Sequence, residues 1–182
     1  MACELIIGGA RSGKSRCAEQ RAAHDGREIV VVATAEALDP EMAERIEQHR
    51  RDRPSHWHTV EAPLRLAGTL RRQAAPGRVL VVDCLTLWLS NCMARSEDAS
   101  RPRNLRQLTW LVDEREALLA CLPDLPGRVL LVANEVGFGV VPETPLGRLF
   151  RDEAGRLNQC VAALADRVTL VVAGLELELK PR

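Results

Sequence analysis

A phosphate-binding loop near the start of the chain constrains the fold more than any other feature of the sequence. The segment GGARSGKS at residues 8–15 matches the pattern G-x-x-x-x-G-K-[ST], with an apolar run before it and a helical pattern after it. Its glycines allow successive backbone amides to face a polyphosphate, and the positive end of the following helix adds to that field. Lys14 is predicted to bridge the outer phosphates of a nucleotide, and Ser15 to hold a Mg²⁺ ion through its hydroxyl. The loop predicted to bind the nucleotide comprises Gly8, Gly9, Ala10, Arg11, Ser12, Gly13, Lys14 and Ser15.

The bulk properties of the chain favour a small-molecule partner. With 182 residues, 46% of them hydrophobic and 27% charged, the chain is expected to form one domain over residues 1–182. A formal net charge of zero gives no general attraction to nucleic acid or to an anionic membrane. No apolar run approaches the roughly 20 residues that span a bilayer, and no signal-peptide pattern opens the chain. Six scattered cysteines without a C-x-x-C pair argue against a metal site or disulfides and favour a reducing cytoplasm.

Strand and helix patterns alternate along the whole chain. Helical periodicity fills the segments between apolar, β-branched runs, which are typical of parallel strands buried on both faces. Those runs are at 28–33, 79–82, 128–133 and 168–173, and residues 176–180 alternate as an edge strand does. This order predicts an α/β fold of the P-loop NTPase type, with a mostly parallel central sheet, helices on both faces and a short edge strand at the C-terminus. The polar stretch 95–103 is predicted to be a mobile surface loop.

Two strand ends carry residues suited to a nucleotide site. The apolar run at 79–82 leads into Asp83, and a carboxylate at this place reaches the Mg²⁺ of a phosphate loop directly or through water. A strand-end Asp also serves as a helix N-cap, so the pattern leaves both roles open. Another strand ends in Ala33, Thr34 and Ala35, at the edge of the sheet where ligands bind in open α/β folds. These small side chains leave room for a nucleotide, although a tight turn accounts for them equally well.

A charged helix is predicted between Asp39 and Pro54. Asp39 is a good N-cap, Pro40 suits the first helical position, and Pro54 ends the helix. Met42 and Ile46 are expected to point toward the core.

Spacing by four places Glu41, Arg45, His49 and Arg53 on one stripe of this helix. One interpretation is a solvated charged face with a bystander histidine. The other rests on chemistry: flanking arginines disfavour the imidazolium, and neutral imidazole is the nucleophilic form. The same arginines could bind the phosphates that such a nucleophile attacks. The pattern alone leaves both interpretations open.

Two further histidines, His56 and His58, occupy a short extended segment. They share a strand face, but no cysteine or acidic cluster completes a ligand set, so no metal site is expected there. Glu61 is predicted to make a polar contact at the end of this strand.

Several segments, taken in this order, resemble the cobinamide kinase/cobinamide-phosphate guanylyltransferase family of cobalamin biosynthesis. The resemblance covers almost the whole chain. The segments that carry it are residues 8–15, 33–35, 41–54, 57–61, 83–86, 134–137, 141–143 and 150–159. Glu176 departs from the family, because relatives tend to carry proline at this place in the terminal strand.

The resemblance implies two transfers on one chain. The aminopropanol hydroxyl of adenosylcobinamide first receives the γ-phosphate of ATP or GTP. GTP then gives GMP to a histidine with release of pyrophosphate, and adenosylcobinamide phosphate accepts the GMP to form adenosylcobinamide-GDP. The guanylylated histidine of the family follows an Arg-Ile pair, and that position is His49 here. Family members form trimers, so the resemblance also implies a homotrimer.

The resemblance further implies which residues contact the nucleotide. Lys14 and Mg²⁺ would stabilise the γ-phosphate, and arginines after His49 would offset the charge that develops at the α-phosphate. Either the nucleotide repositions between the two steps or the helix moves. The implied nucleotide contacts are Gly8–Ser15, Ala33, Thr34, Ala35, Arg50, Arg51, Asp52, Arg53, Glu61 and Asp83, with Ser15 and Asp83 at the metal.

Two other functions compete with this one. The chain could be a different P-loop kinase for a small metabolite, without guanylyl transfer, or a nucleotide-dependent switch. The complete phosphate loop and the polar helix after Pro145 favour an enzyme over a switch.

Overall fold

The computed structural model describes residues 2–37, 39–95 and 108–181. Residues 96–107, which include most of the predicted surface loop, lie outside that description, as do the side chains of Arg45 and Asp52.

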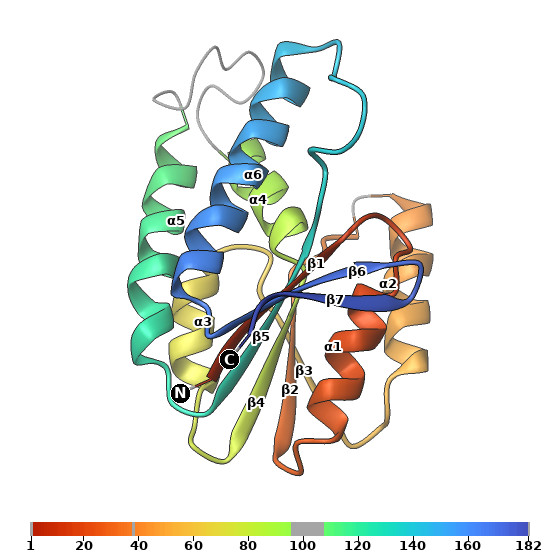
Figure 1. The fold of residues 1–182 in the computed structure, drawn as a ribbon, viewed down its shortest axis with the longest axis vertical. Helices are drawn as coiled ribbons and strands as arrows, with labels where there is room; N and C mark the ends of the chain where they lie inside the picture. Colours follow the sequence, from red (N-terminus) through yellow and green to blue (C-terminus); the bar gives the residue numbers. More distant parts are fainter. Residues whose placement is uncertain (1, 38, 96–107, 182) are drawn as a thin grey trace.

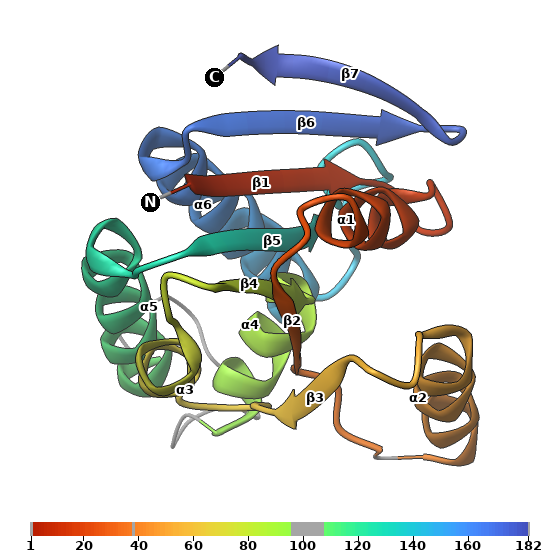
Figure 2. The same cartoon turned by 90° about the horizontal axis from the view of Figure 1, so that it is seen from below.

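One seven-stranded sheet runs through the described residues (Figures 1 and 2). The strand order is β3-β2-β4-β5-β1-β6-β7, and every neighbouring pair is parallel except β6 and β7. The strands are β1 (Ala2–Gly8), β2 (Glu28–Ala33), β3 (His58–Glu61), β4 (Arg78–Asp83), β5 (Arg128–Asn134), β6 (Arg167–Val172) and β7 (Leu175–Lys180). The predicted mostly parallel sheet with a short C-terminal edge strand is therefore confirmed.

Alternating side chains of the strands bury both faces of the sheet. In β2, Val30 and Val32 pack into one core, whereas Ile29 and Val31 pack into the other. Helix α1 covers the second core, and α3, α4, α5 and α6 cover the first, as predicted for helices on both faces (Figure 2). The helices are α1 (Lys14–Ala23), α2 (Pro40–Asp52), α3 (Leu66–Gln73), α4 (Leu85–Arg95), α5 (Thr109–Cys121) and α6 (Pro145–Leu164), with a short 3-10 turn η2 (Leu122–Asp124).

Helix α2 differs from the other helices because it stands beside β3 at the end of the sheet order (Figure 2). Asp39 caps it as predicted, since its Oδ1 accepts a hydrogen bond of 2.7 Å from the backbone N–H of Met42. No residue of α2 whose side chain the structure describes is buried. Contacts at its C-terminal end and around one cavity therefore hold this helix, rather than a core.

Strand β7 pairs antiparallel with β6 and also holds α1. Glu176 accepts hydrogen bonds from Arg21 Nη2 at 2.5 Å and from Cys17 Sγ at 3.0 Å. These bonds hold the pKa of the Glu176 carboxyl below its ordinary value, with the Cys17 bond as the largest cause. The Glu176 carboxylate thus ties the edge strand to the helix that follows the phosphate loop.

No helix in the described part of the chain is both long enough and apolar enough to cross a membrane.

Candidate functional site

The phosphate loop connects β1 to α1 and is shaped by two glycines. A Cβ atom at Gly8 would lie 2.4 Å from Ser12 Oγ and 2.5 Å from the backbone oxygen of Val171. Gly13 has a φ of +99°, a left-handed conformation that side chains rarely adopt. A Cβ at Gly9, in contrast, would meet nothing within 4 Å. The loop is therefore packed tightly on the protein side at Gly8 and is open at Gly9.

Neighbouring segments hold the backbone of the loop in place. The N–H of Glu135 donates to Gly8 O at 2.9 Å, and the N–H of Gly174 donates to Ser12 O at 2.8 Å. Lys14 is buried, and its Nζ donates to Gly9 O at 3.0 Å, so the lysine lies folded over the loop. Ser12 Oγ is buried and has no hydrogen-bond partner among the described residues. This orphaned hydroxyl fits a loop built to receive the oxygens of a phosphate.

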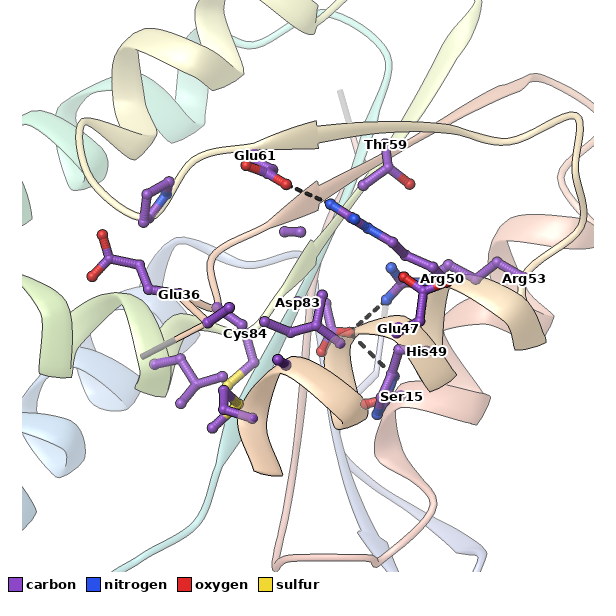
Figure 3. Close-up of a pocket in the computed structure, with 18 of the residues that line it drawn as sticks. Ser15, Glu36, Glu47, His49, Arg50, Arg53, Thr59, Glu61, Asp83 and Cys84 are labelled. Atoms are coloured by element: carbon purple, nitrogen blue, oxygen red, sulfur yellow. Dashed lines mark hydrogen bonds and ion pairs between the residues drawn. The ribbon is translucent and has the colours of Figure 1, made fainter. Parts of the chain in front are cut away.

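A cavity of about 550 Å³ lies between this loop, the carboxyl ends of the strands and α2 (Figure 3). Parallel strands bring their carboxyl ends to one edge of the sheet, where the register pairs Ala33 with both Asp83 and Glu61. The cavity thus collects predicted residues that are far apart in the sequence. Those that line it are Lys14, Ser15, Ala33, Ala35, His49, Arg50, Arg53, Glu61 and Asp83.

Asp83 joins the histidine helix to the sheet. Its Oδ2 lies 2.6 Å from Arg53 Nη2 and 3.9 Å from His49 Nδ1, as the dashed lines of Figure 3 show. The Arg53 side chain is only 7% exposed, and its Nε also donates to Glu19 Oε1 of α1 at 3.2 Å. A guanidinium so deeply placed needs these carboxylates, because an unpaired buried charge is costly. Asp83 therefore pairs with Arg53 and lies close to the imidazole of His49, and Cys84 rather than Asp83 is the residue directly before α4.

Arg50 and Arg51 lie differently on the same helix. Arg50 Nη2 donates to Glu61 Oε1 at the end of β3, across the mouth of the cavity (Figure 3). Arg51 is exposed, and its Nε donates at 3.4 Å to the backbone oxygen of Glu47. Asp52 belongs to α2, but its side chain lies outside the described part.

Thr34 lies behind the cavity rather than on its wall. The residue is fully buried, and its Oγ1 donates to Cys84 O and accepts from Cys84 N, each at 2.8 Å. Asn91 Nδ2 donates to Thr34 O at 2.8 Å from α4. Thr34 thus holds the backbone beside Asp83, while its neighbours Ala33 and Ala35 face the cavity.

The predicted placement of Met42 and Ile46 is wrong. Neither side chain joins a core, and both line the cavity with His49. The spacing 42, 46, 49 and 53 puts these side chains on one helical face, and the cavity takes that face because α2 lies beyond the carboxyl ends of the strands. With Ala35 and Leu87 they form an apolar wall of the cavity that the sequence analysis did not predict. The helical spacing did show that Met42, Ile46 and His49 share a face.

A Mg²⁺ ion would find oxygen donors at one end of the cavity. The Ser15 hydroxyl and the Asp83 carboxylate both line it, next to the loop that receives phosphates. One carboxylate with a hydroxyl and substrate phosphate oxygens suits Mg²⁺, which keeps several waters. No cluster of three or more His, Cys, Asp or Glu side chains occurs among the described residues, so an all-protein metal cage is not offered there. Burial raises the pKa of the Cys84 thiol at the wall, which leaves it a neutral group.

Sequence comparisons identify a family over nearly the whole chain. The family model described as cobinamide kinase / cobinamide phosphate guanyltransferase matches residues 4–179. A Pseudomonas aeruginosa protein described as bifunctional adenosylcobalamin biosynthesis protein CobP is 54% identical over 177 residues, which cover 97% of this chain and 96% of that protein. The Salmonella typhimurium and Escherichia coli proteins described as bifunctional adenosylcobalamin biosynthesis protein CobU are 40% and 41% identical over 179 residues, 97% of this chain and 98% of each relative.

Structure comparisons find P-loop ATPases. An ATPase from the type III secretion system of pathogenic bacteria aligns with a TM-score of 0.60 at 11% identity over 97% of this chain and 56% of that chain. The ATPase EscN of enteropathogenic E. coli aligns with a TM-score of 0.55 at 13% identity over 94% of this chain and 43% of its own. This chain spans about half the length of these ATPases. At such identities the likeness concerns the fold alone.

Proposed function

Because the chain belongs to the cobinamide kinase and cobinamide phosphate guanyltransferase family, we propose that it carries out two nucleotide-dependent transfers in one cavity. The first phosphorylates adenosylcobinamide with ATP or GTP. The second moves GMP from GTP through His49 to adenosylcobinamide phosphate, and the product is adenosylcobinamide-GDP. The observation that carries the proposal is that Lys14 and Ser15 of the phosphate loop line the same cavity as His49.

In the first step the phosphate loop binds the donor nucleotide. Backbone amides between Gly9 and Ser15 receive the phosphates, and Lys14 leaves Gly9 O to meet the outer ones. Ser15 and Asp83 would hold a Mg²⁺ ion, which would supply positive charge to neutralise the departing diphosphate. The residues of the loop act by holding the terminal phosphate in line with the acceptor hydroxyl, since positioning is most of what phosphoryl transfer requires.

In the second step His49 is the nucleophile. Its Nδ1 is the ring nitrogen 3.9 Å from Asp83 Oδ2, and we infer that Nε2, the other ring nitrogen, is the attacking atom. A bond forms between Nε2 and the α-phosphorus of GTP, and the bond to pyrophosphate breaks. A phosphate oxygen of adenosylcobinamide phosphate then attacks the same phosphorus, and the N–P bond breaks to release the histidine.

The arginines of α2 would offset the charge that develops at the α-phosphate. Arg53 and Arg50 both line the cavity, and each pairs there with a carboxylate, Arg53 with Asp83 and Arg50 with Glu61. A triphosphate competes with these carboxylates for the guanidinium groups. Binding of GTP is therefore expected to exchange protein ion pairs for phosphate contacts.

Three further features belong to the proposal. The protein assembles as a homotrimer, which rests on the family resemblance. The 182 residues act as one domain, which rests on the chain length, and the protein works in the cytoplasm, which rests on its scattered cysteines. Light scattering of the purified protein tests the trimer, and a monomer mass under assay conditions would contradict it.

One experiment tests the transferase reaction. The protein is incubated with Mg²⁺ and GTP labelled at the α-phosphate, and the protein fraction is counted after denaturation. We expect an adduct that is labile in acid and stable in alkali, as a phosphoramidate is, and its loss in His49→Ala. Active wild-type protein without an adduct would instead favour the alternative of a P-loop kinase for a small metabolite. Transfer of labelled γ-phosphate to adenosylcobinamide tests the kinase step in parallel.

A further inference from the structure

Asn134 occupies a position in the cavity that neither the phosphate-loop pattern nor the predicted nucleotide contacts include. It is the last residue of β5, and β5 lies between β1, which leads into the phosphate loop, and β4, which ends in Asp83 (Figure 2). The register places Asn134 beside Gly8. Its side chain lines the cavity together with Lys14, Ser15 and Asp83. The carboxamide therefore lies at the phosphate end of the cavity.

The backbone around Asn134 is held from three sides. Its N–H donates to Thr86 Oγ1 of α4 at 2.7 Å, and its carbonyl accepts from Asn158 Nδ2 of α6 at 3.4 Å. The next residue, Glu135, donates to Gly8 O at 2.9 Å. This segment is thus fixed relative to the loop, and the side chain that it carries is preorganised rather than free to adapt.

The side chain itself lacks the partners that a structural amide would have. Asn134 Oδ1 is buried and has no hydrogen-bond partner among the described residues. Asn91, a half-buried amide on α4, shows the contrast, since its Nδ2 donates to Thr34 O at 2.8 Å and to Pro63 O at 3.1 Å. An unsatisfied buried polar atom costs free energy that an apolar side chain would not. A polar group kept at such a cost beside a phosphate loop fits a residue that meets a ligand.

We propose that Asn134 is a catalytic residue of the phosphoryl-transfer step, whose carboxamide hydrogen-bonds the γ-phosphoryl group while it moves. This inference rests on the proposed kinase function. The acceptor hydroxyl oxygen forms a bond to the γ-phosphorus as the bond to the β,γ-bridging oxygen breaks. The nucleoside diphosphate leaves with the electron pair of that bond, and the hydroxyl proton passes to solvent. Oδ1 can only accept a hydrogen bond, so Nδ2 of the same carboxamide is the donor to the equatorial oxygens, which carry charge throughout this transfer.

The same residue is not required for guanylyl transfer. His49 approaches from α2, where it contacts Asp83, and the charge in that step develops at the α-phosphate near the arginines of the helix. Asn134 comes from the opposite side of Asp83, since β4 separates β5 from β2 and β3 in the sheet. A substitution of Asn134 is therefore expected to slow phosphoryl transfer and to leave the rate of guanylyl transfer nearly unchanged.

The test compares both half-reactions in Asn134→Ala, Asn134→Asp and wild-type protein. We expect both variants to lower kcat for phosphoryl transfer to adenosylcobinamide by about 10²-fold, the typical effect of removing one preorganised donor. The rate of formation of the acid-labile guanylyl adduct should change less than about threefold, since no donor to the α-phosphate is lost. The melting temperature of Asn134→Ala should stay the same or rise, because no hydrogen bond of the side chain is removed. Thr169→Val, which removes a buried hydroxyl that also has no partner among the described residues but lies outside the cavity, is the matched control and should keep both activities.

Three results would overturn the inference. Phosphoryl transfer at the wild-type rate in Asn134→Ala would show that the amide does not touch the reacting group. An equal loss of both half-reactions would assign Asn134 to general nucleotide binding, and a fall in melting temperature with both losses would assign it to structure. Wild-type protein that forms the adduct but transfers no γ-phosphate would instead refute the proposed kinase function.

Discussion

Helices α1 and α2 both serve the cavity, but they are held by different forces. Helix α1 follows the phosphate loop and buries Cys17, Ala18 and Ala22 in the core that it forms with the sheet. Helix α2 carries His49, and none of its residues with a described side chain is buried. Its attachment relies on ion pairs from Arg53 to Asp83 and Glu19 and from Arg50 to Glu61. Packing thus fixes the part proposed to bind phosphates, whereas ion pairs hold the helix that carries the proposed nucleophile.

This difference matches the two proposed reactions. Phosphoryl transfer needs one fixed geometry around the terminal phosphate, and a packed loop provides it. Guanylyl transfer requires a nucleophile to approach a second phosphorus, and a helix held by exchangeable ion pairs can adjust its position without disrupting a core. The following predictions test this comparison, beginning with the largest expected effect.

Removing the proposed nucleophile is expected to give the largest difference between the rates of the two reactions. His49→Ala is expected to lower the rate of guanylyl-adduct formation by roughly 10³-fold or more, because no other group replaces the covalent acceptor. Phosphoryl transfer should change less than about threefold, since the phosphate loop is untouched. Parallel assays with label at the α- and γ-phosphate of GTP measure both rates. A comparable loss of the two activities would contradict separate roles for the two helices.

A methyl group at Gly8 is expected to displace the phosphate loop, which is packed tightly at this residue. Gly8→Ala places a Cβ 2.5 Å from the Val171 backbone oxygen, so the loop must shift, at a cost of about 1–3 kcal/mol in the free energy of unfolding. A displaced loop is expected to lower both activities by about 10²-fold. Gly9→Ala is the matched control for stability, because its Cβ would meet nothing within 4 Å. Urea unfolding measures the difference, and equal stability of the two variants would show that the loop is not packed as described.

Removing the ion pairs of Arg53 is expected to slow mainly guanylyl transfer. Arg53→Ala removes the guanidinium that joins α2 to Asp83 and Glu19. We expect guanylyl transfer to fall by about tenfold and phosphoryl transfer by less than about threefold, because only the histidine helix is loosened. Glu44→Gln, an exposed change on the same helix, is the control and should alter neither rate. A larger loss in phosphoryl transfer than in guanylyl transfer would reverse the comparison.

Raising the salt concentration is expected to give a smaller difference between the rates of the two reactions. Raising the ionic strength from about 0.05 M to about 0.5 M screens exposed charges and leaves packed groups unaffected. Guanylyl transfer at saturating GTP is expected to slow by about threefold more than phosphoryl transfer, because Arg50 and Glu61 are exposed partners. Parallel rate measurements over a salt series test this, and identical salt dependence of the two rates would argue that α2 is held by packing.

The smallest expected effect concerns the hydrogen bonds that join Glu176 of β7 to Cys17 and Arg21 of α1. The pKa of the Glu176 carboxyl is lowered from 4.5 by its bonds to Cys17 and Arg21, so the native state favours the ionised form. The resulting stability is fully present above pH 4.5 and is lost as the pH falls through the lowered native pKa. Because the side chain is 44% exposed, Glu176→Gln should reduce stability near neutral pH by only about 0.5 kcal/mol. Unfolding curves over a pH series check this, and a difference from wild type that persists below the native pKa would contradict the assignment.

Local patterns were enough to predict the phosphate loop and most of the elements of the fold. The GGARSGKS segment carries in one stretch the glycines, lysine and serine by which the loop is recognised, and the β-branched runs form strands wherever both faces of a sheet are covered. The prediction that Met42 and Ile46 point toward the core was wrong, because helical spacing shows which residues share a face but not what that face contacts. The family resemblance, rather than the stripe itself, is what favours His49 as a nucleophile over a bystander histidine.

The sequence by itself determined that this chain binds phosphates at the start of a parallel α/β sheet, since that motif is contiguous and its chemistry is local. Only the tertiary structure decided that Asp83 faces both His49 and Arg53 and that Asn134 reaches the same cavity. The reason is strand order: β4 and β5 adjoin β2 and β1 in the sheet, although they follow them by many residues along the chain. Contacts across the carboxyl edge of a sheet depend on that order, which no local pattern in the sequence encodes.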